Sequence, residues 1–184
     1  MTHESGKLVV VSGPSGAGKT SVCRALKEHP TVEFSVSATT RPVRADEIDH
    51  VDYHFLDEDE FVRRRAEGEF LESARYNGHY YGTLRRPMDD ALASGKVFIL
   101  EIEVQGTRQL RDNRVEGDFI FIVPPGMDVL RQRLADRGTN TPEEIEERLS
   151  IAAEELKSRD LYDFVVVNEN LADTVAKVEE RIGL

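Results

Sequence analysis

The segment that most constrains the fold is a glycine-rich motif that directly follows a short apolar run. Residues 13–20, GPSGAGKT, satisfy the pattern G-x-x-x-x-G-K-[ST], follow the apolar run 8–12 and precede a helical run at 21–28. A tight loop with little side-chain bulk lets backbone N–H groups converge on phosphate oxygens, and the helix that follows directs its partial positive end to the same place. The segment therefore predicts a strand, a phosphate-binding loop and a helix in that order.

Two side chains of this motif are expected to contact the phosphates or a metal ion. We expect Lys19 to lie across the β- and γ-phosphates of a nucleoside triphosphate, and Thr20 to offer its hydroxyl to Mg²⁺. The residues predicted to bind ATP are Gly13, Pro14, Ser15, Gly16, Ala17, Gly18, Lys19 and Thr20. Because many unrelated reactions use such a loop, the motif alone leaves the reaction open.

Apolar runs alternate with helical stretches along much of the chain. The runs at 8–12, 96–100, 119–123 and 164–167 are almost continuously apolar, which is typical of parallel strands covered on both faces. We therefore predict an α/β fold with a P-loop NTPase-type parallel sheet core and helices on both faces.

Several residues mark expected helix ends. Asp57-x-x-Glu60 and Thr141-Pro-Glu-Glu144 read as capping boxes, and Gly68, Gly95 and Gly138 stand where helices should stop. Two segments interrupt the alternation, and we interpret both as lobes on a single domain that spans residues 1–184. The predicted division is a core of 1–34, 84–130 and 160–184, a small lobe at 35–83 and a helical lid at about 131–159.

Composition narrows the possible partners. The formal net charge of -11 disfavours generic binding to nucleic acid or acidic membranes, because the average surface potential repels polyanions. No apolar run approaches a membrane span of about 20 residues, and Met1 to Lys7 lacks the apolar stretch of a secretory signal. We therefore expect a cytoplasmic protein with small-molecule partners, and nothing in the sequence sets an oligomeric state. We interpret the lone Cys23 as a small buried hydrophobe.

Motifs beyond the loop together resemble the guanylate kinase family over nearly the whole chain. The segments that carry the resemblance are Phe34-Ser-Val-Ser37-Ala-Thr-Thr-Arg41-Pro-Val-Arg44, Asp52-Tyr53-His-Phe55, Glu69-Phe-Leu-Glu72, Tyr80-Tyr81-Gly82-Thr83, Leu100-Glu101-Ile-Glu103-Val-Gln-Gly106 and Val165-Val-Val-Asn168. The resemblance implies Mg²⁺-dependent transfer of the γ-phosphoryl group of ATP to GMP, without a nucleic-acid or membrane partner.

By this resemblance, one group of residues holds the GMP phosphate and another reads the guanine. The phosphate group is Arg41, Arg44, Tyr53 and Tyr81, and the guanine group is Ser37, Glu72 and Thr83. Arginines and phenols can surround a phosphate dianion with charge-assisted hydrogen bonds. Taken singly, each residue also has an ordinary interpretation as a solvated charge, an exposed strand residue or a half-buried aromatic.

Two carboxylates follow the apolar run at 96–100. Glu101 and Glu103 are expected on one face of their strand, at its carboxyl end, where a cation or hydrogen-bond donors would offset burial. The resemblance places Glu103 near the guanine and the magnesium ion. Glu101 is a candidate to orient metal-bound water, and a structural salt bridge is an equal alternative.

The resemblance also implies that the lid carries arginines. Arg137 and Arg148 match the residues that swing onto the phosphates, so the residues expected to act in catalysis are Lys19, Arg41, Arg137 and Arg148. We interpret Arg131 and Arg159 as parts of a solvated face. The chain departs from the family pattern at Asp46 and His50, where Gly is common, and at Glu103, where Asp is frequent.

Two other functions remain compatible with the motifs. A non-catalytic guanylate-kinase-like module would bind phosphorylated partners through the GMP pocket, but it would not need the intact Lys19, Thr20, Arg137 and Arg148, and the chain shows no flanking interaction domain. A ribose 1,5-bisphosphate phosphokinase would have a similar loop, but it would not need the base-reading residues.

Overall fold

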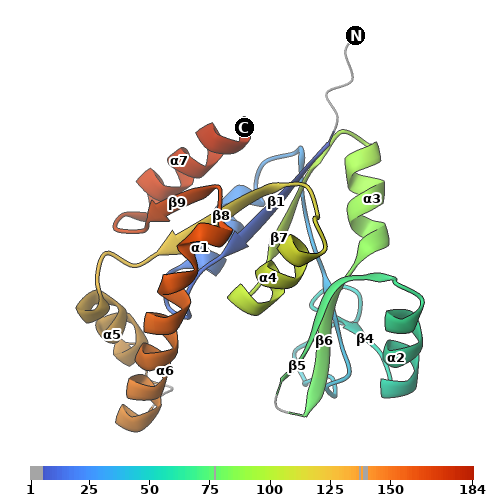
Figure 1. The fold of residues 1–184 in the computed structure, drawn as a ribbon, viewed down its shortest axis with the longest axis horizontal. Helices are drawn as coiled ribbons and strands as arrows, with labels where there is room; N and C mark the ends of the chain where they lie inside the picture. Colours follow the sequence, from blue (N-terminus) through green and yellow to red (C-terminus); the bar gives the residue numbers. More distant parts are fainter. Residues whose placement is uncertain (1–5, 77, 137, 139–140) are drawn as a thin grey trace.

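The four predicted apolar runs form parallel strands of a central sheet, and a short strand that was not predicted, β2 (Val32–Phe34), joins them (Figure 1). The structure is a computed structural model that describes residues 6–76, 78–136, 138 and 141–184. Within them, this sheet has the order β2-β7-β1-β8-β9, with every neighbouring pair parallel. Its strands are β1 (Lys7–Ser12), β2 (Val32–Phe34), β7 (Val97–Glu101), β8 (Asp118–Val123) and β9 (Phe164–Val167). The predicted α/β fold with a parallel core is confirmed.

Helices cover both faces of this sheet because its strands are apolar on both sides. Leu8 and Val10 join a core that includes residues of α3 and α4, whereas Val9 and Val11 join a second core with residues of α1 and α7. Successive side chains of a strand point to opposite faces, so one run of valines supplies both layers. The helices are α1 (Lys19–Leu26), α3 (Arg85–Ala93), α4 (Val104–Asp112) and α7 (Leu171–Ile182).

Residues 35–83, predicted as a lobe, contain a second sheet of order β4-β3-β6-β5. Its elements are β3 (Ser37–Thr39), β4 (His54–Phe55), α2 (Glu58–Ala66), β5 (Phe70–Tyr76) and β6 (His79–Leu84). One face packs on α2, where the fully buried Phe61 stacks on Phe70 at 4.4 Å and on Tyr80 at 5.3 Å between ring centroids. Period-2 alternation leaves the side chains of Tyr81 and Thr83 on the other face.

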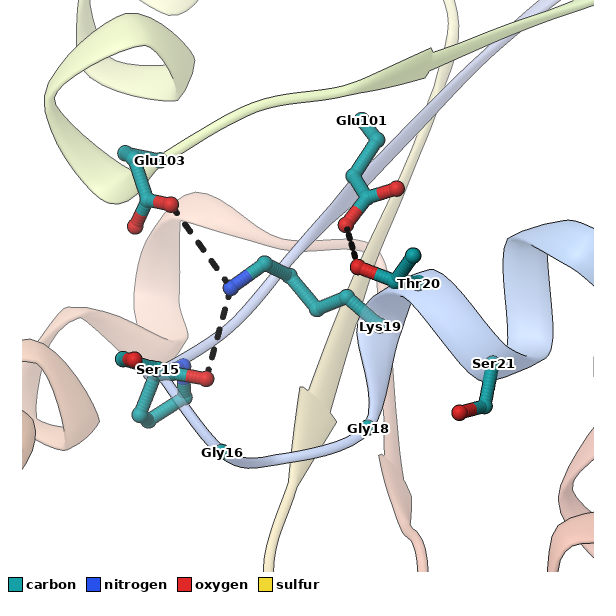
Figure 2. A pocket seen from close by; sticks show the side chains of 9 residues that line it. Ser15, Gly16, Gly18, Lys19, Thr20, Ser21, Glu101 and Glu103 are labelled. Atoms are coloured by element: carbon teal, nitrogen blue, oxygen red, sulfur yellow. Dashed lines mark hydrogen bonds and ion pairs between the residues drawn. The ribbon is translucent and has the colours of Figure 1, made fainter. Parts of the chain in front are cut away.

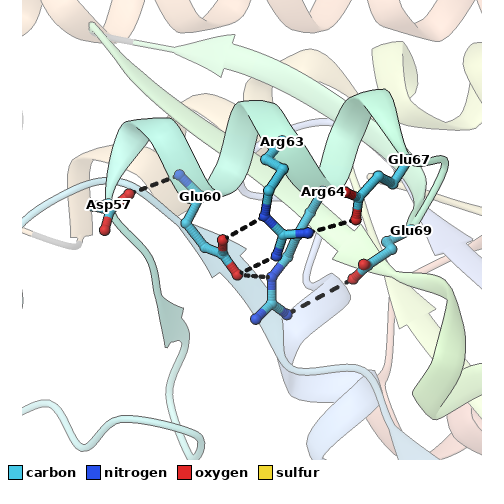
Figure 3. A network of polar contacts seen from close by, with 6 residues as sticks. All are labelled: Asp57, Glu60, Arg63, Arg64, Glu67 and Glu69. Atoms are coloured by element: carbon cyan, nitrogen blue, oxygen red, sulfur yellow. Dashed lines mark hydrogen bonds and ion pairs between the residues drawn. The ribbon is translucent and has the colours of Figure 1, made fainter.

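The two predicted capping boxes have different outcomes. Thr141 and Glu144 form the complete box at the start of α6 (Pro142–Glu155). Asp57 accepts the Glu60 N–H at 2.7 Å, but the Glu60 carboxylate turns away and binds Arg63 and Arg64 (Figure 3). The box at Asp57 is therefore only half formed, because Arg63 and Arg64 bind the Glu60 carboxylate that would complete it.

The charge-rich segment after β8 forms two packed helices. α5 (Met127–Asp136) and α6 share a small core of Leu130, Leu134, Ile145, Leu149 and Ala152, and a 3-10 helix, η1 (Leu156–Leu161), leads back to β9. The α5–α6 pair and the small sheet occupy different sides of the lower half of Figure 1. Within the described part of the chain, no helix is both long and apolar enough to cross a membrane.

Phe61→Ala should destabilise the protein by about 3–5 kcal/mol, because it removes a large buried side chain and leaves a cavity under the small sheet. Urea denaturation followed by circular dichroism measures this change. The matched control is Val62→Ala on the same helix, where the side chain is 39% exposed and the expected change is within about 0.5 kcal/mol. Equal losses in the two variants would contradict the assigned core.

Candidate functional site

The glycine loop, residues 13–18, connects β1 to α1 through backbone conformations that suit glycine. Gly13 has φ +149° and Gly18 has φ +98°. A Cβ atom at Gly13 would clash with the Ile122 carbonyl, and one at Gly18 would clash with the Asn168 side chain. The left-handed Gly18 lets α1 begin at Lys19, two residues before the predicted start.

The Lys19 side chain folds back over this loop. It is 7% exposed, and its Nζ donates to the carbonyl oxygens of Gly13 at 2.5 Å and Pro14 at 3.3 Å. Its ammonium lies 3.8 Å from Oε1 of Glu103 (Figure 2). The cation is thus held over the loop by oxygen partners.

Glu101 and Glu103 meet the loop from the end of β7. Thr20 Oγ1 donates to Glu101 Oε1 at 2.8 Å, and both glutamates line a cavity of about 180 Å³ with Lys19 and Thr20 (Figure 2). The expectation of a shared strand was wrong, because β7 ends at Glu101 and Glu103 is the N-cap of α4. The Glu103 side chain is 67% exposed, so it is not a buried carboxylate.

Two side chains hold the glycine loop by hydrogen bonds to the Ala17 carbonyl, and sequence reasoning gave neither a role. Asn168, 5% exposed, donates from Nδ2 to the Ala17 carbonyl at 2.8 Å. Arg133 of α5 donates to the same carbonyl at 3.4 Å and to the Asn168 carbonyl at 2.8 Å. Asn168 and Arg133 both lie in segments that resemble the family, but their partners are distant in the sequence, so no local pattern predicts these contacts.

The three residues predicted to read guanine lie in one row across the small sheet. Thr83 of β6 pairs with Ser37 of β3 on one side and with Glu72 of β5 on the other. Thr83 Oγ1 donates to Glu72 Oε1 at 2.8 Å. Burial raises the pKa of Glu72, and the hydrogen bonds from Thr83 oppose that rise. The carboxylate therefore sits in an environment that favours further donors.

Helix α4 supports this row from the central sheet. A Cβ atom at Gly106 would lie 3.1 Å from Glu72 Oε2, so the missing side chain makes room for the carboxylate. Gln109 donates to the Ser73 carbonyl at 3.0 Å and accepts the Ser73 N–H at 3.1 Å, as a neighbouring strand would. These contacts fix β5 against α4, and sequence reasoning did not find Gln109.

The residues predicted to hold a phosphate gather beside the row. The Arg41 guanidinium lies 5.2 Å from the ring centroid of Tyr53, and the rings of Tyr53 and Tyr81 are 6.3 Å apart. Arg41 also forms an ion pair with Glu47 at 2.7 Å, and Glu47 accepts the backbone N–H of Arg44 at 2.9 Å. Glu47 was not anticipated.

The turn before Tyr53 keeps a glycine-like conformation despite the substitution noticed at residue 50. His50 has φ +64°, and its N–H donates to the Tyr53 carbonyl at 2.8 Å. Its Nδ1 lies 2.7 Å from Nδ1 of His54, whose pKa is lowered by burial and by the neighbouring His50. The histidine thus adopts the strained conformation and retains the turn.

The α5–α6 pair reaches the glycine loop through Arg148, whose Nη1 donates to Ser15 Oγ at 3.2 Å. Arg137, predicted to act with it, lies outside the described residues. Arg131, interpreted as a solvated side chain, is exposed but binds the Glu146 carboxylate on α6. At the end of α6, burial and then repulsion from Glu103 raise the pKa of Glu155 to about 7.

Cys23 lies in the core of the central sheet, as predicted. It is 2% exposed, and burial raises the pKa of its thiol. Among residues 6–76, 78–136, 138 and 141–184, no group of three or more His, Cys, Asp or Glu side chains is placed to hold a metal ion.

Comparisons with known proteins identify the family of this chain. The family model described as guanylate kinase matches residues 5–183. The chain belongs to the guanylate kinase family. It is 47% identical over 178 residues to a guanylate kinase of Clostridium perfringens (strain SM101 / Type A), covering 96% of this chain and 82% of the relative. It is 48% identical over 172 residues to that of Frankia casuarinae, covering 93% and 94%.

A solved structure shows the same fold. The crystal structure of guanylate kinase from Anaplasma phagocytophilum superposes with a TM-score of 0.76 at 32% identity, covering 98% of this chain and 86% of that one. The predicted membership of the guanylate kinase family is thus confirmed by sequence and by structure.

Glu155→Gln should remove a pH dependence of stability. The pKa of Glu155 is about 7 in the folded chain, against an ordinary value near 4.5, so the folded state retains a proton that the unfolded state loses between these values. The free energy of unfolding therefore falls as the pH rises through this window. At pH 8 the variant should be more stable by on the order of 1 kcal/mol, and at pH 4 the difference should vanish.

Thermal unfolding at several pH values, without nucleotide, measures this effect. Glu154→Gln is the matched control, because Glu154 is exposed and pairs with Lys157 at 2.7 Å. A Glu155→Gln variant whose stability follows that of the wild type at every pH would contradict the raised pKa.

Proposed function

We propose that this chain transfers the γ-phosphoryl group of ATP to GMP and so produces ADP and GDP. The observation that carries the proposal is the first turn of α4, where Glu103 contacts Lys19 and Gly106 lies beneath Glu72. Three residues of a helix span about 4.5 Å along its axis. A triphosphate on the glycine loop and a purine monophosphate on the small sheet would thus meet across one helix end.

On the donor side, the loop residues 13–18 would cradle the ATP phosphates with backbone N–H groups. Lys19 would exchange its carbonyl partners for the β- and γ-phosphates. The Thr20 hydroxyl and the Glu101 carboxylate are oxygen ligands of the kind that Mg²⁺ takes from proteins, usually one or two beside phosphates and waters. When bound, Mg²⁺ neutralises charge on the transferring phosphoryl group.

On the acceptor side, Glu72 is suited to read guanine. A carboxylate can accept from both N1–H and the exocyclic 2-amino group, and Thr83 already orients it. Ser37 lies in the same row. Adenine lacks the 2-amino group and presents a lone pair at N1, so the half-buried carboxylate would receive no hydrogen bond from the base and would face a lone pair, and such mismatches discriminate by about 10⁴ or more.

The GMP phosphate would lie beside this row. Arg41 and Arg44 supply positive charge, and the phenols of Tyr53 and Tyr81 supply donors on the same side. The ring and guanidinium distances support one cluster of Arg41, Tyr53 and Tyr81. A phosphate held there needs little covalent help from the protein, because positioning and charge dominate phosphoryl transfer.

Residues 131–159 would act as a lid over the donor phosphates, and residues 35–83 would form the GMP-binding lobe on a core of 1–34, 84–130 and 160–184. The contact between Arg148 and Ser15 supports this division. Arg148, with Arg137, would stabilise charge on the transferring group, and closure would exclude water. The activity fits a cytoplasmic enzyme of purine nucleotide metabolism.

The direct test is a coupled assay of ADP release with ATP, Mg²⁺ and one of three acceptors. Only GMP should give rapid turnover, whereas AMP and ribose 1,5-bisphosphate should give less than about one hundredth of that rate. Lys19→Ala is the negative control and should abolish turnover while the circular dichroism spectrum stays unchanged. Absence of GDP formation by the purified wild type would overturn the proposed function.

Glu72→Gln should lower the preference for GMP over AMP by roughly 100-fold, because the amide loses one acceptor and presents its own donor to the base. The measurement is the ratio of kcat/KM for the two monophosphates. Glu69→Gln, an exposed change near the same strand, is the control and should retain the wild-type ratio. Unchanged selectivity in Glu72→Gln would remove Glu72 from base recognition.

A further inference from the structure

The strongest unexplained contact in the small sheet joins Glu47 to Arg41. Two nearly parallel hydrogen bonds run from Nη1 to Oε2 at 2.8 Å and from Nη2 to Oε1 at 2.7 Å. The Arg41 and Glu47 side chains are only 12% and 16% exposed. Bidentate, partly buried pairs of this kind hold a guanidinium in one orientation, unlike the mobile ion pairs of an open surface.

The geometry leaves part of the guanidinium available. Glu47 binds the edge formed by Nη1 and Nη2, and Nη1 also donates to the Pro42 carbonyl at 2.8 Å. A planar guanidinium presents a second paired edge, formed by Nε and Nη2. Among the ion pairs of the described residues, none places another carboxylate on Arg41, and the other side chain that hydrogen-bonds the guanidinium is Tyr81. Because Tyr81 is itself assigned to the phosphate, a phosphate can bind Arg41 on the side of Tyr81, away from Glu47.

Glu47 also organises the backbone that carries the second arginine. Its Oε2 accepts the Arg44 N–H at 2.9 Å, and the Glu47 N–H donates to the Arg44 carbonyl at 3.1 Å. The pKa of Glu47 is lowered to about 2, first by the hydrogen bond from Arg41. The carboxylate thus stays charged at neutral pH and links the two arginines.

We propose that Glu47 is a positioning residue that holds Arg41 and the Arg44 turn in the geometry that receives the phosphate of GMP. The proposal rests on the proposed function, because it deepens the assignment of that same site. Glu47 does not contact substrate in this scheme. It fixes the orientation of the Arg41 guanidinium, whose carbon lies 5.2 Å from the ring centroid of Tyr53 and 5.6 Å from that of Phe55.

The charge of Glu47 makes an opposite role conceivable, in which the carboxylate competes with the phosphate for Arg41. Positioning is favoured because Glu47 binds one edge of the guanidinium, because Tyr81 of the predicted phosphate group also binds Arg41, and because Glu47 fixes the Arg44 turn. The two roles predict opposite changes in affinity when Glu47 is removed.

The test compares the affinities of GMP and guanosine by isothermal titration calorimetry in the wild type, Glu47→Gln and Glu47→Ala. The ratio of the guanosine Kd to the GMP Kd isolates the contribution of the phosphate. This ratio should fall on the order of 10- to 100-fold in Glu47→Ala, because losing one hydrogen bond to a charged group usually weakens binding by about that factor. It should fall less in Glu47→Gln, and guanosine affinity should stay unchanged in both variants.

The matched control is Glu60→Gln, which removes a carboxylate paired with two arginines on α2, the helix that packs on the small sheet (Figure 3). This control should leave the ratio unchanged. Tighter GMP binding in Glu47→Ala, an unchanged ratio, or an equal loss for guanosine would overturn the positioning role.

The proposed phosphoryl transfer and the proposed role of Glu47 can be refuted separately. A wild type that binds GMP more tightly than guanosine but forms no GDP would refute the phosphoryl transfer and leave the role of Glu47 open to the same calorimetric comparison. A wild type that forms GDP, with a ratio unaffected by Glu47→Ala, would refute only the role of Glu47.

Discussion

The parallel pairing of β1 with β7 is the constraint on which the site depends. The register sets Val11 opposite Glu101, so both strands end at the same edge of the sheet. The glycine loop follows β1 at this edge. It places Lys19 and Thr20 beside Glu101 and Glu103, and all four residues line one cavity. Alternate apolar residues of these strands pack in two different cores, so a one-residue slip in register would exchange the side chains of the two layers and disrupt the packing of both. The hydrophobic pattern thus fixes the position of polar groups that contribute nothing to the core.

Helix α4 connects this edge of the central sheet to the small sheet. Its first turn presents Glu103 to Lys19, and farther along the helix Gly106 and Gln109 contact β5 beside Glu72. A helix is stiff over this length, so the distance between the loop and the row of Ser37, Thr83 and Glu72 is set by the hydrogen-bonded helix backbone and not by a mobile linker. The arrangement suits a reaction whose acceleration comes mainly from positioning two charged substrates.

Much of the central fold was predictable because its signals are local. Four apolar runs marked β1, β7, β8 and β9 within one residue, whereas the short strand β2 was not predicted, and the box at Thr141 marked a helix start. The same reasoning failed at Asp57, where Arg63 and Arg64 capture the glutamate that the box requires. It also failed at Glu103, because the strand ended two residues earlier than alternation suggested. At Asp57 a neighbouring contact outweighed the pattern, because a pattern encodes propensity but not competition between partners.

The contacts that shape the site were largely invisible in the sequence, for two physical reasons. Some join segments distant along the chain, as when Asn168 supports Ala17 at the glycine loop or Gln109 supports Ser73. Others are close in sequence but ambiguous in chemistry. Glu47 follows Arg41 by six residues in a charged turn, where a solvated glutamate is the ordinary expectation. Only the burial of the pair and the orientation of its two bonds distinguish a fixed partner from a surface charge. A motif specifies which groups touch the substrate, whereas the residues that aim those groups are specified by the folded geometry.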